Sequence, residues 1–121
     1  MTQRLIVAGS RGITISSIVD NAILAWSDQY GAPSRIISGG AQGVDRLGEE
    51  FAQDHVLERL IMPAIWTQDG KFNRGAGYAR NIRMAYEADA LLAIWDGESK
   101  GTKHMIDIAR AEGLGVKVVV L

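Results

Sequence analysis

The fold of this chain is indicated most clearly by residues 35–45, which read RIISGGAQGVD. The apolar start of this stretch is typical of a strand buried on both faces of a sheet, and the glycines after it break the strand. Beyond the glycines, Val44, Leu47, Phe51 and Ala52 recur at the spacing of a helix that packs on a sheet. The stretch therefore predicts one strand, the loop at its carboxyl end and the start of a helix.

The same order of elements recurs on both sides of this stretch. Residues 64–74 are the one long irregular segment, in which Asp69-Gly70 predicts a turn. The other apolar runs predict strands at residues 5–8, 57–62, 90–95 and 116–121. The helical patterns cover residues 15–26, 77–87 and 102–112.

Alternation of about five strands with four helices predicts an α/β fold, because parallel strands need crossover connections and those are right-handed. We expect one Rossmann-like domain over residues 1–121, with a parallel sheet of order 3-2-1-4-5 and helices on both faces. The switch in topology then falls between the first and fourth strands. The crevice at the carboxyl ends of these strands is the expected binding site.

The composition limits the function classes. The chain has 121 residues, a formal net charge of −1 and no cysteine, which excludes disulfides and a cysteine nucleophile. Without a basic excess, nucleic acid is expected to be an unlikely partner. No signal peptide or membrane span is apparent, so we expect a cytoplasmic protein without a membrane partner. A homodimer is possible, since so small a domain can use a second copy to wall off its pocket.

Three of the predicted strands end in loops rich in glycine and small polar residues. Glycine lets backbone N–H groups approach an anion, and the following helix adds free donors and a partial positive charge, so these loops suit a phosphate group. Tight turn geometry is the alternative explanation for each loop taken alone. The candidate phosphate-binding residues are Gly9, Ser10, Arg11, Ser38, Gly39, Gly40, Gly97, Ser99, Gly101 and Thr102.

Residues 66–83 concentrate positive charge, since Lys71, Arg74, Arg80 and Arg83 face Asp69 as the only acid. Arg74, Arg80 and Asn81 are candidates for reaching over the crevice to hold an outer phosphate or a sugar, because arginine makes bidentate contacts with phosphate. A solvated helix start with salt bridges would explain the same residues.

Two acids lie beside these loops. Asp45 begins the second helix and Asp96 ends the fourth strand, so each is a candidate catalytic acid or base or a ligand of a sugar hydroxyl. A favourable contact with a helix dipole is the alternative for Asp45, and Asp96 has the same two explanations. Trp66 and Trp95 are candidates for stacking on a base, with a place in the core as the alternative.

The sequence contains no recognisable metal site or catalytic triad. His55 and His104 lack the spaced partners of a zinc site, and no GxSxG elbow is present. We therefore expect no metal and no cofactor of the protein's own, with Mg²⁺ entering only with a nucleotide.

Four loop motifs together resemble the SLOG superfamily, which is named after the Smf/DprA and Lonely guy proteins. The similarity is greatest to its YspA/cpYpsA-related branch, whose members are often encoded by phages and prophages. The motifs are GSR at 9–11, SGGAQGVD at 38–45, RNIRM at 80–84 and WDGESKGT at 95–102. The resemblance implies a Rossmann-like fold that binds nucleotides or nucleotide-derived ligands at these loops.

The Lonely guy enzymes cleave the N-glycosidic bond of nucleoside monophosphates with the glutamate of a PGGxGTxxE motif. The matching run here is residues 97–105, in which Gly101 and Thr102 agree and Met105 replaces the glutamate. A thioether cannot act as an acid, so this chemistry would need Asp45, Asp96 or Glu98 instead.

Three functions remain in order of preference. The first is binding of a phosphorylated nucleotide or a nucleotide-derived signal, which the protein would sense or sequester. The second is a nucleotide N-glycosidase or related hydrolase or transferase that uses Asp45 or Asp96. The third is binding of single-stranded DNA, by analogy with the DprA branch.

Overall fold

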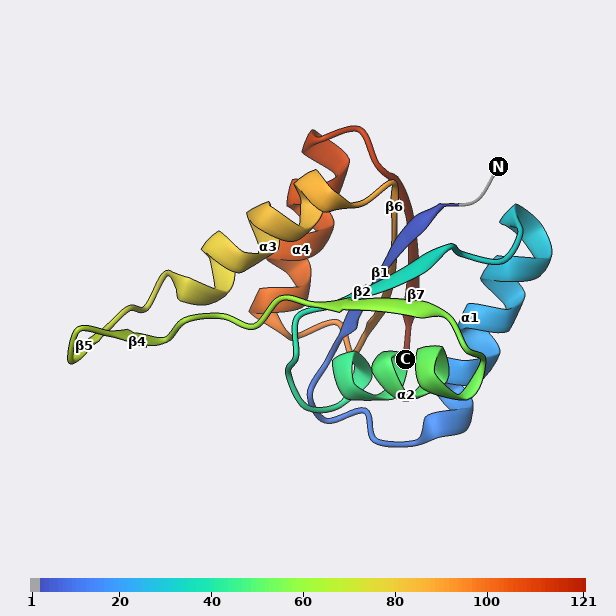
Figure 1. Cartoon of the computed structure of the whole chain (residues 1–121), viewed down its shortest axis with the longest axis horizontal. Helices are drawn as coiled ribbons and strands as arrows, with labels where there is room; N and C mark the ends of the chain where they lie inside the picture. Colours follow the sequence, from blue (N-terminus) through green and yellow to red (C-terminus); the bar gives the residue numbers. More distant parts are fainter. Residues whose placement is uncertain (1–2) are drawn as a thin grey trace.

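The computed structural model describes residues 3–121 and has a five-stranded sheet of order β3-β2-β1-β6-β7, in which all four strand pairings are parallel (Figure 1). This is the predicted order 3-2-1-4-5, once the two short strands outside the sheet are set aside. The sheet strands are β1 (Arg4–Gly9), β2 (Arg35–Ser38), β3 (Glu58–Ile61), β6 (Ala90–Trp95) and β7 (Gly115–Val120).

Helices cover both faces of the sheet, as the alternating pattern predicts. On one face, α1 (Ser16–Tyr30) and α2 (Val44–Asp54) pack on Leu5, Val7 and Ile36. On the other face, α3 (Ala76–Glu87) and α4 (Lys100–Ala111) pack on Ile6 and Ile37. Neighbouring residues of a strand point to opposite faces, so a continuous apolar strand supplies both cores.

The central strands are more deeply buried than the edge strands. In β1 and β6 most side chains are buried, whereas β3 is exposed at three of its four residues. The apolar run at 57–62 was expected to form a strand like the others, but it forms a shorter strand at the edge of the sheet.

The segment expected to be irregular contains a small hairpin. Strands β4 (Thr67–Gln68) and β5 (Lys71–Phe72) pair antiparallel, with Thr67 opposite Phe72. Asp69 and Gly70 between them both have positive φ, 53° and 75°, as a type I′ turn requires. The predicted turn is confirmed. The two strands escape prediction because two residues are too few to show alternation.

The ends of β1 and β6 meet where the chain connections diverge. Gly9 pairs with Ile94, and the N–H of Ser10 donates to the carbonyl oxygen of Ile94 (3.1 Å). A Cβ on Gly9 would lie 2.0 Å from that oxygen, so only glycine allows this approach.

Within residues 3–121 no helix is both long and apolar enough to cross a bilayer.

Candidate functional site

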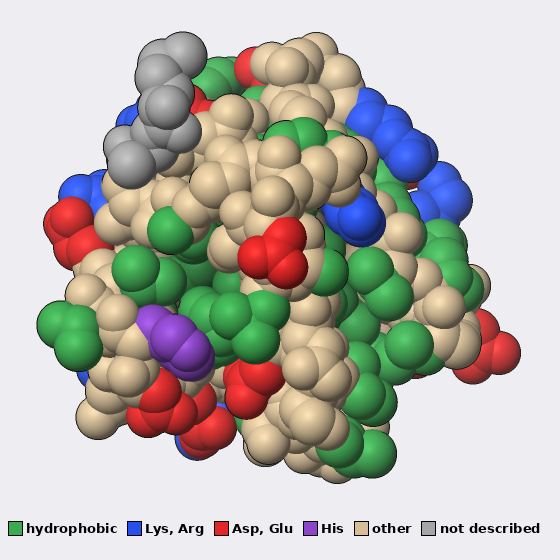
Figure 2. Space-filling view, turned by 90° about the vertical axis from the view of Figure 1, so that its right-hand side faces the viewer, with side chains coloured by type: hydrophobic (Ala, Val, Ile, Leu, Met, Phe, Trp, Pro, Cys, Tyr) green, Lys and Arg blue, Asp and Glu red, His purple; other side chains and the backbone are tan. Residues whose placement is uncertain are grey.

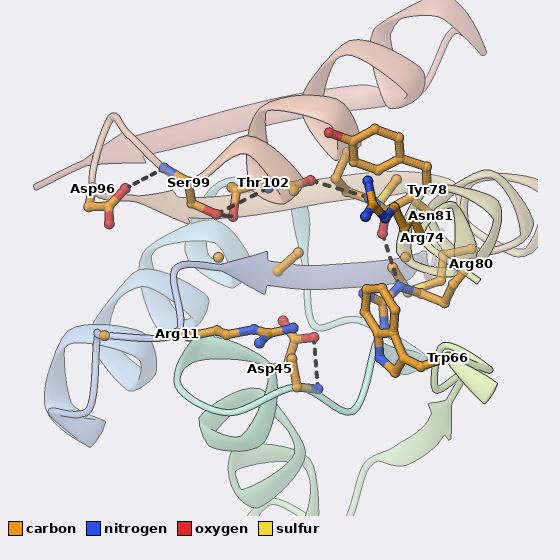
Figure 3. A pocket seen from close by; sticks show the side chains of 18 residues that line it. Arg11, Asp45, Trp66, Arg74, Tyr78, Arg80, Asn81, Asp96, Ser99 and Thr102 are labelled. Carbon is orange, nitrogen blue, oxygen red and sulfur yellow. Dashed lines mark hydrogen bonds between the residues drawn. The ribbon is translucent and has the colours of Figure 1, made fainter. Parts of the chain in front are cut away.

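A pocket of about 450 Å³ opens at the carboxyl ends of β1 and β6 (Figure 3). This volume is in the range of small-molecule sites, and the location is the expected one for a doubly wound sheet. The walls come from the loops after β1, β2 and β6, from the first turns of α3 and α4, and from Trp66 of the hairpin segment. The predicted residues that line it are Gly9, Arg11, Asp45, Arg80, Asn81, Asp96, Ser99, Gly101 and Thr102.

Arg80 is the most firmly held cation of the pocket. Its Nη1 donates to the carbonyl oxygen of Gly39, and its Nε donates to Oδ1 of Asn81 (3.0 Å). A Cβ on Gly39 would lie 2.5 Å from Nη1, so the loop must have glycine at this position. Partial burial lowers the pKa of Arg80, but the guanidinium remains charged at neutral pH. The pocket wall therefore carries a fixed positive group.

Asn81 connects Arg80 to α4. Its Oδ1 accepts the bond from Arg80, and its Nδ2 faces the carbonyl oxygen of Gly101 (3.2 Å) and Nδ1 of His104 (3.1 Å). Both assignments are required, because arginine can only donate and a carbonyl can only accept. Nδ1 of His104 must then be the acceptor, which places the proton of the neutral ring on Nε2. The ring of Tyr78 stacks on His104 with centroids 4.1 Å apart.

Asp45 is a buried acid in the pocket wall, with only 5% of its surface exposed. Burial raises the pKa of Asp45 to about 6, although the N–H of Ala41 and the positive charge of Arg80 favour the ionised form. A carboxyl group with this pKa can exchange a proton near neutral pH. Of the two candidate acids, Asp45 has the environment that catalysis would need.

The glycine-rich loop after β2 is held by hydrogen bonds within the protein. Its N–H groups are bound within the protein, since Gly40 donates to Oγ of Ser38 (3.1 Å) and Ala41 donates to the carboxylate of Asp45 (3.2 Å). Oγ of Ser38 in turn donates to Glu49 (2.6 Å). Ser38, Gly39 and Gly40 therefore do not line the pocket. The side chain of Asp45 thus occupies the N–H group of Ala41 in the same loop.

The loop after β6 is also held from within. Oδ1 of Asp96 accepts from the N–H groups of Glu98 (2.8 Å) and Ser99 (2.9 Å), and these bonds lower the pKa of Asp96. Gly97 has φ 84° in this turn and does not line the pocket. Asp96 thus lies at the pocket as an ionised, loop-stabilising carboxylate, which is a poor general acid.

Ser10, a predicted phosphate ligand, has a buried contact within the protein. The side chain is 1% exposed, and its Oγ accepts from the N–H of Asp96 (3.0 Å). Ser10 thereby connects the loop after β1 to the loop after β6, and it does not line the pocket.

The structure also adds residues to the site. Trp66 and Arg74, which the sequence left open between binding and structural roles, both line the pocket, whereas Trp95 does not. Tyr78 lines it as well, and no sequence signal singled it out. Met105 is 1% exposed at the pocket wall, so a buried thioether lies where the resemblance placed a glutamate.

Charged side chains of both signs line the pocket, three of them basic and two, Asp45 and Asp96, acidic. Arg11, Arg74 and Arg80 all line the pocket, and acidic and basic side chains are interspersed on the face turned away from the hairpin (Figure 2). Among residues 3–121, no group of three or more His, Cys, Asp or Glu side chains is placed to hold a metal ion.

Sheet order, helix placement and the pocket at the switch point define a Rossmann-like α/β protein with a Smf/DprA-like fold. A solved structure with this fold is DNA processing protein A from Helicobacter pylori, described for its single-stranded DNA binding mode. The identity is 18% and the TM-score 0.71, over 95% of this chain and 64% of that chain. This chain therefore spans less than two thirds of that protein. Neither family models nor curated protein sequences match the chain.

This likeness overturns one expectation from composition. Nucleic acid was expected to be an unlikely partner because the net charge is −1, yet a protein of the same fold binds single-stranded DNA. The net charge averages over the whole surface, whereas binding depends on the local field, and here three arginines share one pocket. The expectation that the net charge makes nucleic acid an unlikely partner was wrong.

Proposed function

We propose that the pocket binds a phosphorylated nucleotide. The observation that carries this proposal is the pairing of cations with aromatic rings around one pocket, with Arg11, Arg74 and Arg80 beside Trp66 and Tyr78. Guanidinium groups suit phosphate oxygens, and aromatic faces suit a base. Gly101 and Thr102 on the opposite wall belong to the first turn of α4, where the partial positive charge of the helix N-terminus favours a phosphate.

In this proposal Arg80 and Arg11 hold the phosphate and the aromatic side chains hold the base. Arg80 is positioned before the ligand arrives, because Gly39 and Asn81 already bind its guanidinium. A group ordered in advance loses little conformational entropy on binding. Arg11 is exposed and is the more adaptable contact.

A second candidate function is the binding of single-stranded DNA, with one of its nucleotides in the same pocket. The observation in its favour is the fold shared with the Helicobacter pylori protein. The phosphate and base contacts would be the same. From the four loop motifs we also propose that the chain belongs to the YspA/cpYpsA-related branch.

The experiment is calorimetric titration with nucleoside mono-, di- and triphosphates, ADP-ribose and a thymidine oligonucleotide, at fixed salt and with and without Mg²⁺. Arg11→Ala is the main test, because Arg11 is exposed and its loss leaves the core intact. Arg83→Ala is the matched control, since Arg83 lies exposed on α3 and does not line the pocket.

We expect Arg11→Ala to weaken nucleotide affinity about tenfold, as loss of one charge-assisted hydrogen bond would. Equal affinity in Arg11→Ala and Arg83→Ala would rule out the pocket as the phosphate site. Each sample is then analysed by chromatography. Release of a free base by the parent protein but not by Asp45→Asn would instead show the N-glycosidase alternative.

A further inference from the structure

The hairpin β4–β5 projects from the body of the protein beyond the start of α3 (Figure 1). Large apolar side chains are exposed in the hairpin and just before it, with Phe72 66% and Ile65 57% exposed. The rings of Trp66 and Phe72 lie nearly parallel, with an interplanar angle of 13° and centroids 6.1 Å apart. An exposed aromatic pair on a projecting hairpin is a surface suited to a flat ligand group.

This aromatic surface is continuous with the pocket. Trp66 lines the pocket, and its Cη2 would lie 3.1 Å from a Cβ on Gly77 in the first turn of α3. The indole therefore lies between α3 and Phe72. A ligand that fills the pocket and extends past Trp66 would next meet Phe72.

The charges near this surface favour a polyanion. Lys71 and Arg74 are exposed, and Asp69 is the only acid between residues 66 and 83. The ion pairs formed within residues 3–121 are Arg4 with Asp89, Arg35 with Glu58 and Lys103 with Asp107. Lys71 and Arg74 are therefore available for phosphate groups.

We propose that the hairpin binds a second nucleotide of single-stranded DNA, adjacent to the one held in the pocket. The second base stacks on Phe72, and the phosphates on either side meet Lys71 and Arg74. Aromatic stacking beside a cationic track is the way in which proteins hold single strands without reading their sequence. This proposal rests on the second candidate function given above, since it extends a single strand outward from the nucleotide in the pocket.

The test compares two ligands across the same variants. Affinity for a fluorescein-labelled thymidine oligonucleotide of about 12 nucleotides is measured by anisotropy, a length within the range that one small binding domain covers. Affinity for thymidine monophosphate is measured by calorimetry. Tyr86→Ala is the matched control for Phe72→Ala, because Tyr86 is a similarly exposed aromatic residue (68%) on α3 outside the pocket.

We expect Phe72→Ala to weaken oligonucleotide binding about fivefold or more, the lower end of the effect of losing one base stack. Phe72→Tyr should retain affinity for the oligonucleotide because it keeps an aromatic ring. Phe72→Leu should lose that affinity because it keeps only the apolar bulk that could support the hairpin. Lys71→Ala should lower the slope of log affinity against log salt by about 0.7, as for one phosphate of a single strand. Monophosphate affinity should stay within about twofold in all these variants, since stacking on Phe72 concerns only the second base.

Equal oligonucleotide affinity in Phe72→Ala and Tyr86→Ala would overturn the hairpin proposal, as would oligonucleotide binding no tighter than monophosphate binding. So would equal binding of the corresponding duplex, whose stacked bases cannot reach Phe72. None of these results bears on the proposal that the pocket binds a nucleotide. That proposal is contradicted separately if Arg11→Ala leaves the affinity for thymidine monophosphate unchanged. If neither ligand binds, both proposals are wrong.

Discussion

Arg80 lies directly against Gly39, 41 residues earlier in the chain, and donates a hydrogen bond to its carbonyl oxygen. The contact joins the start of α3 to the loop after β2 and holds a cation at the pocket wall. A Cβ on Gly39 would also lie 2.8 Å from Oδ2 of Asp45. One glycine therefore keeps the pocket's fixed cation and its buried acid in place.

Gly39→Ala should displace Arg80 and weaken nucleotide binding. Overpacking of this kind costs about 1–3 kcal/mol of unfolding free energy, and a displaced guanidinium should lower affinity about tenfold. Denaturant unfolding and calorimetric titration measure the two effects. Gly115→Ala is the control, because a Cβ there meets nothing within 4 Å. Unchanged binding by Gly39→Ala would contradict the role given to this contact.

Asp45 should make the protein less stable as pH rises. Its folded pKa of about 6 lies above the ordinary 3.8, so the folded state binds the proton more tightly than the unfolded state. Its contribution to stability is complete below about pH 4 and is lost as pH rises through about 6, by about 3 kcal/mol in total. Relative to the parent, Asp45→Asn should gain stability between pH 4 and 7 in urea unfolding. A constant difference would show that the pKa of Asp45 is ordinary.

His104 should act in the opposite direction. Burial lowers the pKa of His104, so the folded state binds its proton less tightly than the unfolded state. Protonation at Nδ1 would also replace the acceptor that faces Asn81 with a second donor. Stability from His104 is therefore present above its unfolded pKa of about 6.5 and is lost as pH falls. The free energies of unfolding of His104→Asn and of the parent, each measured at pH 5 and at pH 8, give this pH-dependent contribution. The variant should lose less stability on acidification, and an equal loss would contradict the prediction.

Ser10→Ala should reduce stability without reducing nucleotide affinity. The substitution leaves the N–H of Asp96 without its partner, at a cost of about 1–3 kcal/mol. Affinity should stay within about twofold, since Ser10 does not line the pocket. Ser17→Ala at an exposed position of α1 is the control. A large loss of affinity without loss of stability would restore Ser10 as a phosphate ligand.

The sequence alone determined the sheet and the location of the pocket. Apolar strands such as residues 90–95 must be buried on both faces, and their alternation with helices allows few topologies. The switch point follows from strand order, which is why Arg11 and Asn81 were expected in one crevice and do lie there. These features depend on periodicity, which is a local property of the chain.

Only the tertiary structure decided which polar groups face the pocket. Ser38 ends β2 and Arg80 lies in α3, and both were expected to hold a phosphate, yet Ser38 binds Glu49 inside the protein and Arg80 remains at the pocket wall. Tyr78 and the stacking of Trp66 on Phe72 likewise depend on how α3 and the hairpin pack. A polar side chain binds whichever partner folding brings within about 3 Å, and that partner can be far away in the sequence.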